Sequence, residues 1–384
     1  MKKNIVGIVA PYKEPNYGTV LQAYALQSIL KKMGVHTEYI NYTLDRAPYF
    51  RRKISNIKKT WLRFFSKKMV AKSSGIEDFS FVDSPQFQSF KANFASFVKK
   101  HLTISAKEYN PISITKCKKY QSVIVGSDQT WSKPRCGKDS LYLLDPIPLN
   151  VKRLSYAPSI GTTHIDKEYI EFLVSRLQKF EMLSCRERTN CLLLSERLKR
   201  NVEFVVDPTL LKSNNDWDKI AVPNPLSIKR YILCYILGFK KEIQEYAENI
   251  SRITNIPLYY IVTRPEYQHM ENTLYPSPQL FLSLIRDAAY VITDSFHGTA
   301  FSINYGTQFY CFTKRSDNDS NNDNDRLFEL LKVFGLESRL LSKSDCVNLS
   351  PIDYTNVHDK LFALRKDSLD YLIRMKDAIN RQER

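Results

Sequence analysis

The chain has 384 residues, of which 43% are apolar and 12% aromatic, enough for sizeable hydrophobic cores in two domains. Its 57 basic and 40 acidic residues leave a net charge of +17, which indicates an anionic partner or surface. No stretch of eighteen apolar residues occurs, which excludes a membrane-spanning helix. The seven cysteines are odd in number and lack CxxC spacing, so we expect a reducing cytoplasm and neither a disulfide scaffold nor a zinc ribbon.

The N-terminal part begins as a βαβ unit. The apolar run 5–10 is too short for a signal peptide and fits a buried strand. Residues 19–33 have helical periodicity, with Thr19 suited to the N-cap and Gly34 to the residue after the helix, and 35–42 fit a second strand. Four phenylalanines at three-four-three spacing predict a core helix: Phe87, Phe90, Phe94 and Phe97. Further strands are expected at 122–125, 153–157, 182–186 and 204–206, so the sheet is predicted to be parallel.

Residues 46–72 form a basic, aromatic segment with ten Lys or Arg and no acid. Ile54, Ile57, Trp61 and either Phe64 or Phe65 fall near helical spacing, so one face would be apolar and the rest basic. Such a helix can lie in the headgroup layer of an anionic membrane, which predicts peripheral attachment to the inner face of the cytoplasmic membrane. The alternative is a solvated basic helix that covers the N-terminal domain.

A second alternating series follows a linker-like stretch. Strands are predicted at 231–237, 258–262, 290–293 and 308–312, and helices at 240–252, 278–288 and after Asp294. The predicted division is an N-terminal Rossmann-like domain at 1–211, a linker at 212–228, a C-terminal Rossmann-like domain at 229–345 and a helical tail at 346–384. Apolar residues between 358 and 384 share a helical face, so the tail is expected to pack back across both domains.

The segment 290–306 is the most informative part of the chain, because it predicts a buried strand that turns sharply into a helix. Asp294 and Ser295 suit the N-cap, and His297 and Gly298 would lie in the first turn. A helix start attracts anions, glycine allows a close approach, and histidine titrates near neutral pH. The segment therefore predicts an anion site beside a proton donor.

Polar residues at other predicted strand ends are further candidates. Asp128 and Gln129 follow the strand 122–125, where the Asp128 carboxylate suits either a general base or a local turn. The loop before the first helix offers four candidates for phosphate or sugar binding, or is an ordinary connection: Asn16, Tyr17, Gly18 and Thr19. Arg186 and Arg326 suit either anion binding or surface ion pairs. No metal motif is present.

Six segments, in this order, resemble one known family. They are 16–27 (NYGTVLQAYALQ), 125–131 (VGSDQTW), 155–161 (SYAPSIG), 184–188 (SCRER), 205–211 (VVDPTLL) and the 291–306 segment. Together they resemble the polysaccharide pyruvyl transferases over about residues 4–341, with Arg326 beyond the last segment. Members often carry arginine directly after the residue matching Asp294, where this chain has Ser295. That arginine is thought to hold the anionic donor, and Arg186 or Arg326 is a candidate to replace it.

The resemblance implies a GT-B-like pair of Rossmann-like domains facing a cleft. It also implies transfer of a pyruvyl group from phosphoenolpyruvate to a sugar or lipid-linked oligosaccharide, as a cyclic ketal, with no separate cofactor. His297 would be the acid and Asp128 or Asp294 the base, while the helix start, with Ser295, Gly298 and Thr299, would help to bind substrate.

Two alternatives remain open at this point. A GT-B-type nucleotide-sugar glycosyltransferase also requires a phosphate site at a helix start and a base in the cleft. A non-catalytic anion or nucleic-acid binder would fit the net charge, but no nucleic-acid module is recognisable and the charge is concentrated in 46–72, so we expect no nucleic-acid partner.

Overall fold

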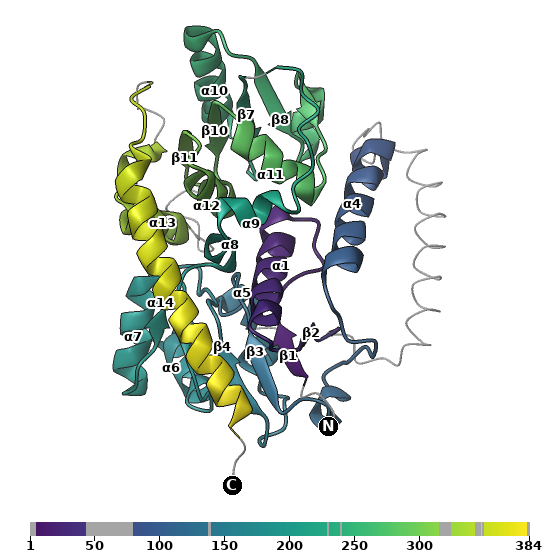
Figure 1. Cartoon of the computed structure of the whole chain (residues 1–384), viewed down its shortest axis with the longest axis vertical. Coiled ribbons are helices and arrows are strands. Elements are labelled where there is room, and N and C mark those ends of the chain that lie inside the picture. Colours follow the sequence, from purple (N-terminus) through teal and green to yellow (C-terminus); the bar gives the residue numbers. More distant parts are fainter. Residues whose placement is uncertain are drawn as a thin grey trace.

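The computed structural model describes residues 5–43, 80–136, 140–228, 230–238, 240–314, 324–341, 347 and 349–381. Two α/β units lie one above the other in Figure 1, and a long C-terminal helix runs along both. Within those ranges no helix is both long and apolar enough to cross a membrane. The segment 46–72 lies outside the described residues, so its membrane attachment stays a prediction.

The N-terminal unit is built on a parallel sheet with strand order β2-β1-β3-β4. Its strands are β1 (Val6–Val9), β2 (Thr37–Tyr39), β3 (Ser122–Val125) and β4 (Lys152–Ser155). A bridge from Leu154 to Met182 leads on to the parallel pair β5 (Ser184–Cys185) and β6 (Glu203–Phe204). The helices are α1 (Tyr17–Lys32), α3 (Ser80–Asp83), α4 (Pro85–His101), α5 (Lys133–Cys136), α6 (Lys167–Leu177) and α7 (Arg188–Leu198), with 3-10 turns η1 (Ile114–Lys116) and η2 (Ser140–Leu143). The chain order reverses between β1 and β3, which opens a crevice at their carboxyl ends.

The C-terminal unit has a parallel sheet with order β12-β11-β10-β7-β8-β9, the strand order of dinucleotide-binding Rossmann folds. Its strands are β7 (Ile232–Tyr235), β8 (Leu258–Ile261), β9 (Thr273–Leu274), β10 (Tyr290–Thr293), β11 (Phe309–Phe312) and β12 (Leu340–Leu341). Its helices are α10 (Lys241–Thr254), α11 (Pro278–Asp287), α12 (Phe296–Tyr305) and α13 (Asp325–Phe334), with 3-10 turns η3 (Pro265–His269) and η4 (Glu337–Arg339). Here the order reverses between β7 and β10.

The predicted α/β class with two Rossmann-like domains is confirmed by these two parallel sheets. The strand predicted at 290–293 has those bounds, and Gly34 adopts the left-handed φ of +82° expected after a helix. The prediction that Thr19 caps the first helix is wrong. The helix starts two residues earlier because the Asn16 side chain accepts a hydrogen bond from the Thr19 amide at 3.1 Å.

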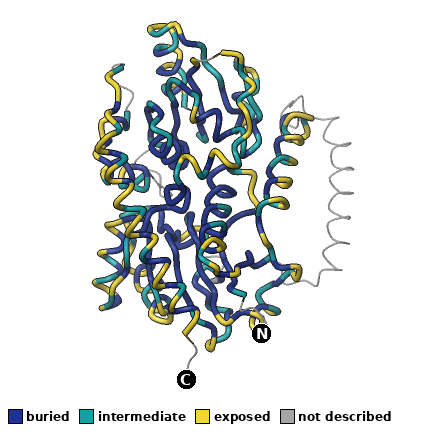
Figure 2. The backbone as a smooth tube through the Cα atoms, viewed as in Figure 1, coloured by how far each residue is buried: buried dark blue, intermediate teal, exposed yellow. Residues whose placement is uncertain are grey.

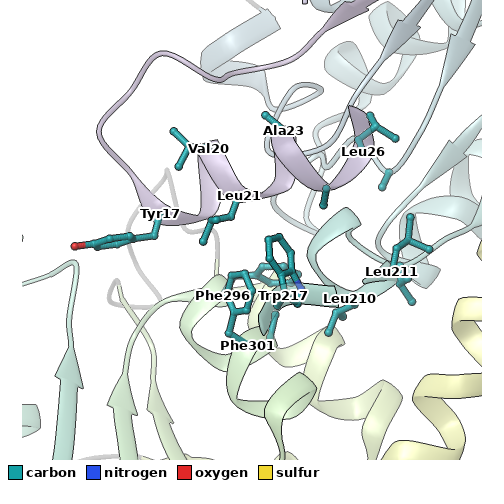
Figure 3. Packing of buried hydrophobic residues seen from close by; sticks show 14 of the residues in the cluster. Tyr17, Val20, Leu21, Ala23, Leu26, Leu210, Leu211, Trp217, Phe296 and Phe301 are labelled. Atoms are coloured by element: carbon teal, nitrogen blue, oxygen red, sulfur yellow. The ribbon is translucent and has the colours of Figure 1, made fainter. Parts of the chain in front are cut away.

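A continuous apolar core joins the two units (Figure 3). The ring of Tyr17, at the start of α1, stacks on Phe281 of α11 at 4.1 Å, and its hydroxyl donates to the Pro276 carbonyl at 2.8 Å. Two short helices, α8 (Pro208–Leu211) and α9 (Asn214–Asp218), connect the units, and α9 lies in the predicted linker 212–228. The fully buried Trp217 of α9 packs on Phe301 of α12 at 5.1 Å. The units are therefore joined by apolar packing as well as by the chain.

The last helix, α14 (Tyr354–Asn380), crosses from the C-terminal to the N-terminal unit, as predicted (Figure 1). Near its start, Tyr354 donates to the Thr307 carbonyl. Further along, the Ser368 hydroxyl accepts from the Val206 amide at 3.1 Å, and the Tyr371 hydroxyl donates to the Ser155 carbonyl at 2.9 Å. Buried and exposed residues alternate along α14 (Figure 2).

Tyr17 tests how strongly this junction holds the units together. Tyr17→Ala should lower the free energy of unfolding by about 3–5 kcal/mol, as expected for deleting a fully buried aromatic side chain. Tyr17→Phe keeps the stacked ring and loses one hydrogen bond, so it should cost about 1 kcal/mol. Urea denaturation of both variants measures the difference, and equal losses would show that the stacked ring contributes little.

Candidate functional site

The two crevices face each other across one cavity of about 200 Å³. The N-terminal unit contributes the lining residues Glu14, Asn16, Thr19, Asp128, Gln129 and Arg135. The C-terminal unit contributes residues 294–297, Lys314, Asn324, Arg326, Leu237 and Leu327. The cavity therefore lies where ligands bind in open α/β sheets, at the carboxyl ends of the strands beside a reversal of strand order.

Ser295, not Asp294, is the N-cap of α12. Its hydroxyl accepts from the Gly298 amide at 3.3 Å, and its own amide donates to the Thr293 hydroxyl at 3.0 Å. The Asp294 carboxylate instead accepts from the amides of Leu237 and Gly238, at 2.6 and 2.7 Å. It thereby ties the loop after β7 to the end of β10. Burial raises the pKa of Asp294 above its usual value, although these two bonds oppose the shift.

The first turns of α1 and α12 are in direct contact through Gly18 and His297. A β-carbon added to Gly18 would lie 1.9 Å from Nδ1 of His297, so only glycine fits there. We expected Gly18 to admit a ligand, and in the structure it admits the imidazole ring instead. Because both helix starts carry partial positive charge, their meeting favours a negative group at the cavity.

His297 also faces Asp207, a residue for which the sequence suggested no role. Its Nε2 lies 3.7 Å from Asp207 Oδ2, beyond hydrogen-bond distance, and has no other partner among the described residues. The buried Asp207 carboxylate accepts from the Ser127 hydroxyl at 2.9 Å and pairs with Arg186 at 2.7 Å. Burial alone would raise the pKa of Asp207, but His297 and Arg186 hold it well below its usual range. In the sequence, the feature that could have pointed to a role for Asp207 is its position between a predicted strand and a proline.

Asp128 is held in a left-handed backbone conformation, with φ of +73°. Its carboxylate accepts from the Thr19 hydroxyl at 3.2 Å and from the Gln129 amide at 2.8 Å. Burial favours the neutral form, but the charges of Arg186 and Arg135 outweigh it, so the pKa of Asp128 is lowered. Asp128 is therefore an ionised carboxylate in the wall of the cavity.

Three long cations line the cavity, and two of them, Arg135 and Lys314, were not anticipated from the sequence. Arg135 lies 3.5 Å from Glu14 in an ion pair at the cavity wall. The guanidinium carbon of Arg326 is 5.9 Å from the centre of the Phe296 ring. Lys314 lines the cavity near Asp294, and its charge opposes the rise in the pKa of that carboxyl.

Five residues that the sequence suggested do not line this cavity, and one of them is Gly18, which packs against His297. Tyr17 belongs to the junction between the units, and Arg186 is fully enclosed by its partners Asp207 and Glu187. Gly298 permits close packing, since an added β-carbon would lie 2.5 Å from the Thr293 hydroxyl. The fifth, Thr299, is buried in α12 behind the first turn. Asn16, Thr19, Gln129, Ser295 and Arg326 do line the cavity.

Comparison with known proteins shows one family and one architecture. The family model described as polysaccharide pyruvyl transferase matches residues 16–315, and no curated protein matches. Among solved structures, a putative UDP-N-acetylglucosamine 2-epimerase from Listeria monocytogenes is 10% identical, with TM-score 0.51 and coverage of 96% of this chain and 97% of that one. The glycosyltransferase SnogD from Streptomyces nogalater is 8% identical, with TM-score 0.45 and coverage of 99% and 100%. At these identities the likeness concerns the fold alone.

Asp207 should be essential to the stability of the site. Asp207→Ala leaves Arg186 buried with Glu187 as its remaining carboxylate partner, so we expect a loss of about 3–5 kcal/mol in unfolding free energy. The matched control is Asp216→Ala. Because Asp216 pairs with exposed lysines, this substitution should lower the free energy of unfolding by roughly 0–1 kcal/mol. Chemical denaturation compares the two, and similar losses would remove the special role of Asp207.

Proposed function

The chain belongs to the polysaccharide pyruvyl transferase family, and we propose that it transfers a pyruvyl group from phosphoenolpyruvate to two hydroxyls of a sugar, forming a cyclic ketal. The observation that carries this proposal is the cavity itself. It combines two helix starts, three long cations and a buried histidine in one enclosed space. The acceptor would be a free or lipid-linked sugar in surface or capsular polysaccharide synthesis, on the cytoplasmic side of the membrane, and no further cofactor is required.

Phosphoenolpyruvate carries a phosphate and a carboxylate, which matches the distribution of positive charge. Arg135 approaches from the N-terminal unit, and Lys314 and Arg326 approach from the C-terminal unit. An arginine can bind either anion in two-point fashion, while a lysine acts as a point charge. Many family members have an arginine where this chain has Ser295, and here these three cations supply the positive charge instead. The helix starts add backbone amides with partial positive charge.

His297 is the proposed acid. Protonation of the methylene carbon of the donor generates a methyl group and a cationic centre next to the carboxylate, to which a sugar hydroxyl adds. The Asp207 carboxylate supplies negative charge on the Nε2 side of the ring and helps to orient it. The cations that hold the phosphate then stabilise its departure when the second hydroxyl closes the ketal. Each of the two sugar hydroxyls loses a proton. One of these protons restores the acid that protonated carbon, and the other leaves with phosphate.

Asp128 is the better of the two candidates for the base. Its lowered pKa keeps it ionised at neutral pH, and it lies in the cavity wall beside Gln129, which can hydrogen-bond a sugar. Both oxygens of Asp294 already accept backbone amides, and its raised pKa reflects burial in the C-terminal unit. We therefore assign Asp294 to the architecture of the site and Asp128 to the acceptor hydroxyl.

Donor binding is tested by thermal stabilisation. Phosphoenolpyruvate should raise the melting temperature. At a concentration one hundred times its Kd, binding adds about 2.7 kcal/mol to the free energy of unfolding. Lys314→Gln and Arg326→Gln should each reduce the shift, whereas Lys332→Gln, an exposed position on α13 outside the cavity, should not. Stabilisation by nucleotide sugars but not by phosphoenolpyruvate would favour a glycosyltransferase instead.

Replacing the proposed acid should abolish most turnover without unfolding the protein. His297→Ala should lose roughly two to four decades of rate, the usual contribution of a general acid. Product mass, after incubation with phosphoenolpyruvate and candidate lipid-linked sugars, reports the reaction, and the phosphoenolpyruvate melting shift shows whether the site remains formed. Near-normal turnover in a folded His297→Ala variant would exclude His297 as the acid.

A further inference from the structure

The helix α14 has a buried inner face and an exposed outer face. The inner face, which includes Leu361 and Met375, belongs to the apolar core that joins the units. The outer face runs along the outside of both units (Figure 1) and carries three large apolar side chains, with exposed fractions of 71% for Phe362, 36% for Leu369 and 49% for Ile373. The residues that line the reaction cavity come from other parts of the chain, so the proposed reaction gives this face no role.

The outer face follows the pattern of a coiled-coil seam. Six residues recur at alternating intervals of three and four, and we call them the outer stripe: Asp359, Phe362, Lys366, Leu369, Ile373 and Lys376. The first five are exposed and Lys376 is partly exposed. Residues at this spacing lie on one side of a helix, and two helices pack along such a seam when it is apolar. The outer stripe is therefore a surface for another helix.

The order of charges along the outer stripe identifies that helix as α14 of a second copy of the chain. The stripe has a carboxylate at its first position, Asp359, and an ammonium at its last, Lys376. When two copies lie antiparallel about a two-fold axis, Asp359 faces Lys376 of the second copy and Phe362 faces Ile373 of the second copy. Each contact occurs twice, because the two-fold axis repeats it.

The middle of the stripe also fits the antiparallel pair. There Lys366 faces Leu369 of the second copy, so the aliphatic stem of the lysine packs on the leucine while its ammonium reaches water. In a parallel pair each position would face itself, which would set Asp359 against Asp359 and Lys366 against Lys366. Like charges placed opposite each other are unfavourable, so the sequence of the stripe selects the antiparallel orientation.

We propose that the outer stripe of α14 is a homodimer interface, in which two copies of the chain pack their α14 helices antiparallel about a two-fold axis. The proposal does not depend on the proposed function. Because Tyr354 and Tyr371 hold α14 to both units within one chain, pairing requires no ordering of the helix. One pair of helices is a small interface, so we expect a Kd in the micromolar range.

Sedimentation velocity of the full-length chain, over about 1 to 200 µM, tests this interface. The mass should rise from monomer to dimer with concentration. Phe362→Glu should raise the dimer Kd at least tenfold, because symmetry buries two carboxylates against apolar side chains. The control is Phe328→Glu, since Phe328 is 47% exposed on α13 and lies off the stripe, and it should change the Kd less than twofold. A chain that stays monomeric, or equal effects of the two variants, would overturn the proposal.

A charge exchange tests the orientation of the helices. Asp359→Lys and Lys376→Asp should each raise the dimer Kd several-fold, because two attractive pairs become repulsive. The double variant Asp359→Lys/Lys376→Asp restores opposite charges and should return the Kd to within twofold of the original. In a parallel pair Asp359→Lys would exchange one like-charge contact for another, so the double variant would rescue nothing. Absence of rescue would therefore overturn the antiparallel interface.

Two other outcomes would assign the stripe or the dimer differently. If the chain stays monomeric while phosphatidylglycerol vesicles bind it and Phe362→Glu abolishes that binding, the stripe recognises a bilayer and the homodimer proposal is wrong. If the chain dimerises with a Kd that Phe362→Glu leaves unchanged, another surface forms the dimer and the assignment to α14 fails. Melting temperatures of the variants within a few degrees of the original would show that each remains folded.

Discussion

The contact between Gly18 and His297 is the constraint on which the arrangement of the molecule depends. A β-carbon on residue 18 would lie within 1.9 Å of the imidazole, so the two helix starts could not approach as they do. The same approach brings Tyr17 onto Phe281 and closes one apolar core across both units. A hinge motion that separated the units here would expose buried aromatic surface, which is costly. This side of the cavity is therefore preformed.

The opposite side of the cavity is joined by polar contacts. Asp325, at the start of α13, accepts from the Thr162 hydroxyl at 3.0 Å and from the Thr163 amide at 2.7 Å. Further along the helix, Glu329 accepts from the Thr189 hydroxyl at 2.7 Å. Each such bond contributes roughly 0.5–1.5 kcal/mol net, far less than the apolar junction. These bonds position Arg326, next to Asp325, so a cation of the site is held by the weaker of the two contacts between the units.

The strands and the α12 segment could be predicted from the sequence because their signals are local. A short apolar run and a capping residue define β10 and α12, and His297 follows from that pattern. Residues that act across the two units gave no such signal. Tyr17 and Gly18 resemble loop residues until α11 and α12 pack against them, and Arg186 resembles an anion-binding residue until Asp207 encloses it. Arg135 lies in the short helix α5 and Lys314 lies just after β11, and tertiary contacts set the place of both.

Three buried aspartates of the site differ in pKa because their surroundings differ. His297 and Arg186 hold the pKa of Asp207 below the usual range, and Arg186 and Arg135 do the same for Asp128. Burial raises the pKa of Asp294, although two backbone amides oppose the shift. All three carboxylates are buried. At Asp207 and Asp128 the neighbouring cations outweigh the effect of burial, whereas at Asp294 burial outweighs the backbone amides. Ser295 fits the same logic. It caps α12 with a neutral hydroxyl, and in the proposed reaction the positive charge for the anion comes from Arg135, Lys314 and Arg326, on three separate parts of the chain. The proposed anion site is thus a product of the tertiary fold, and the residue after Asp294 does not by itself determine it.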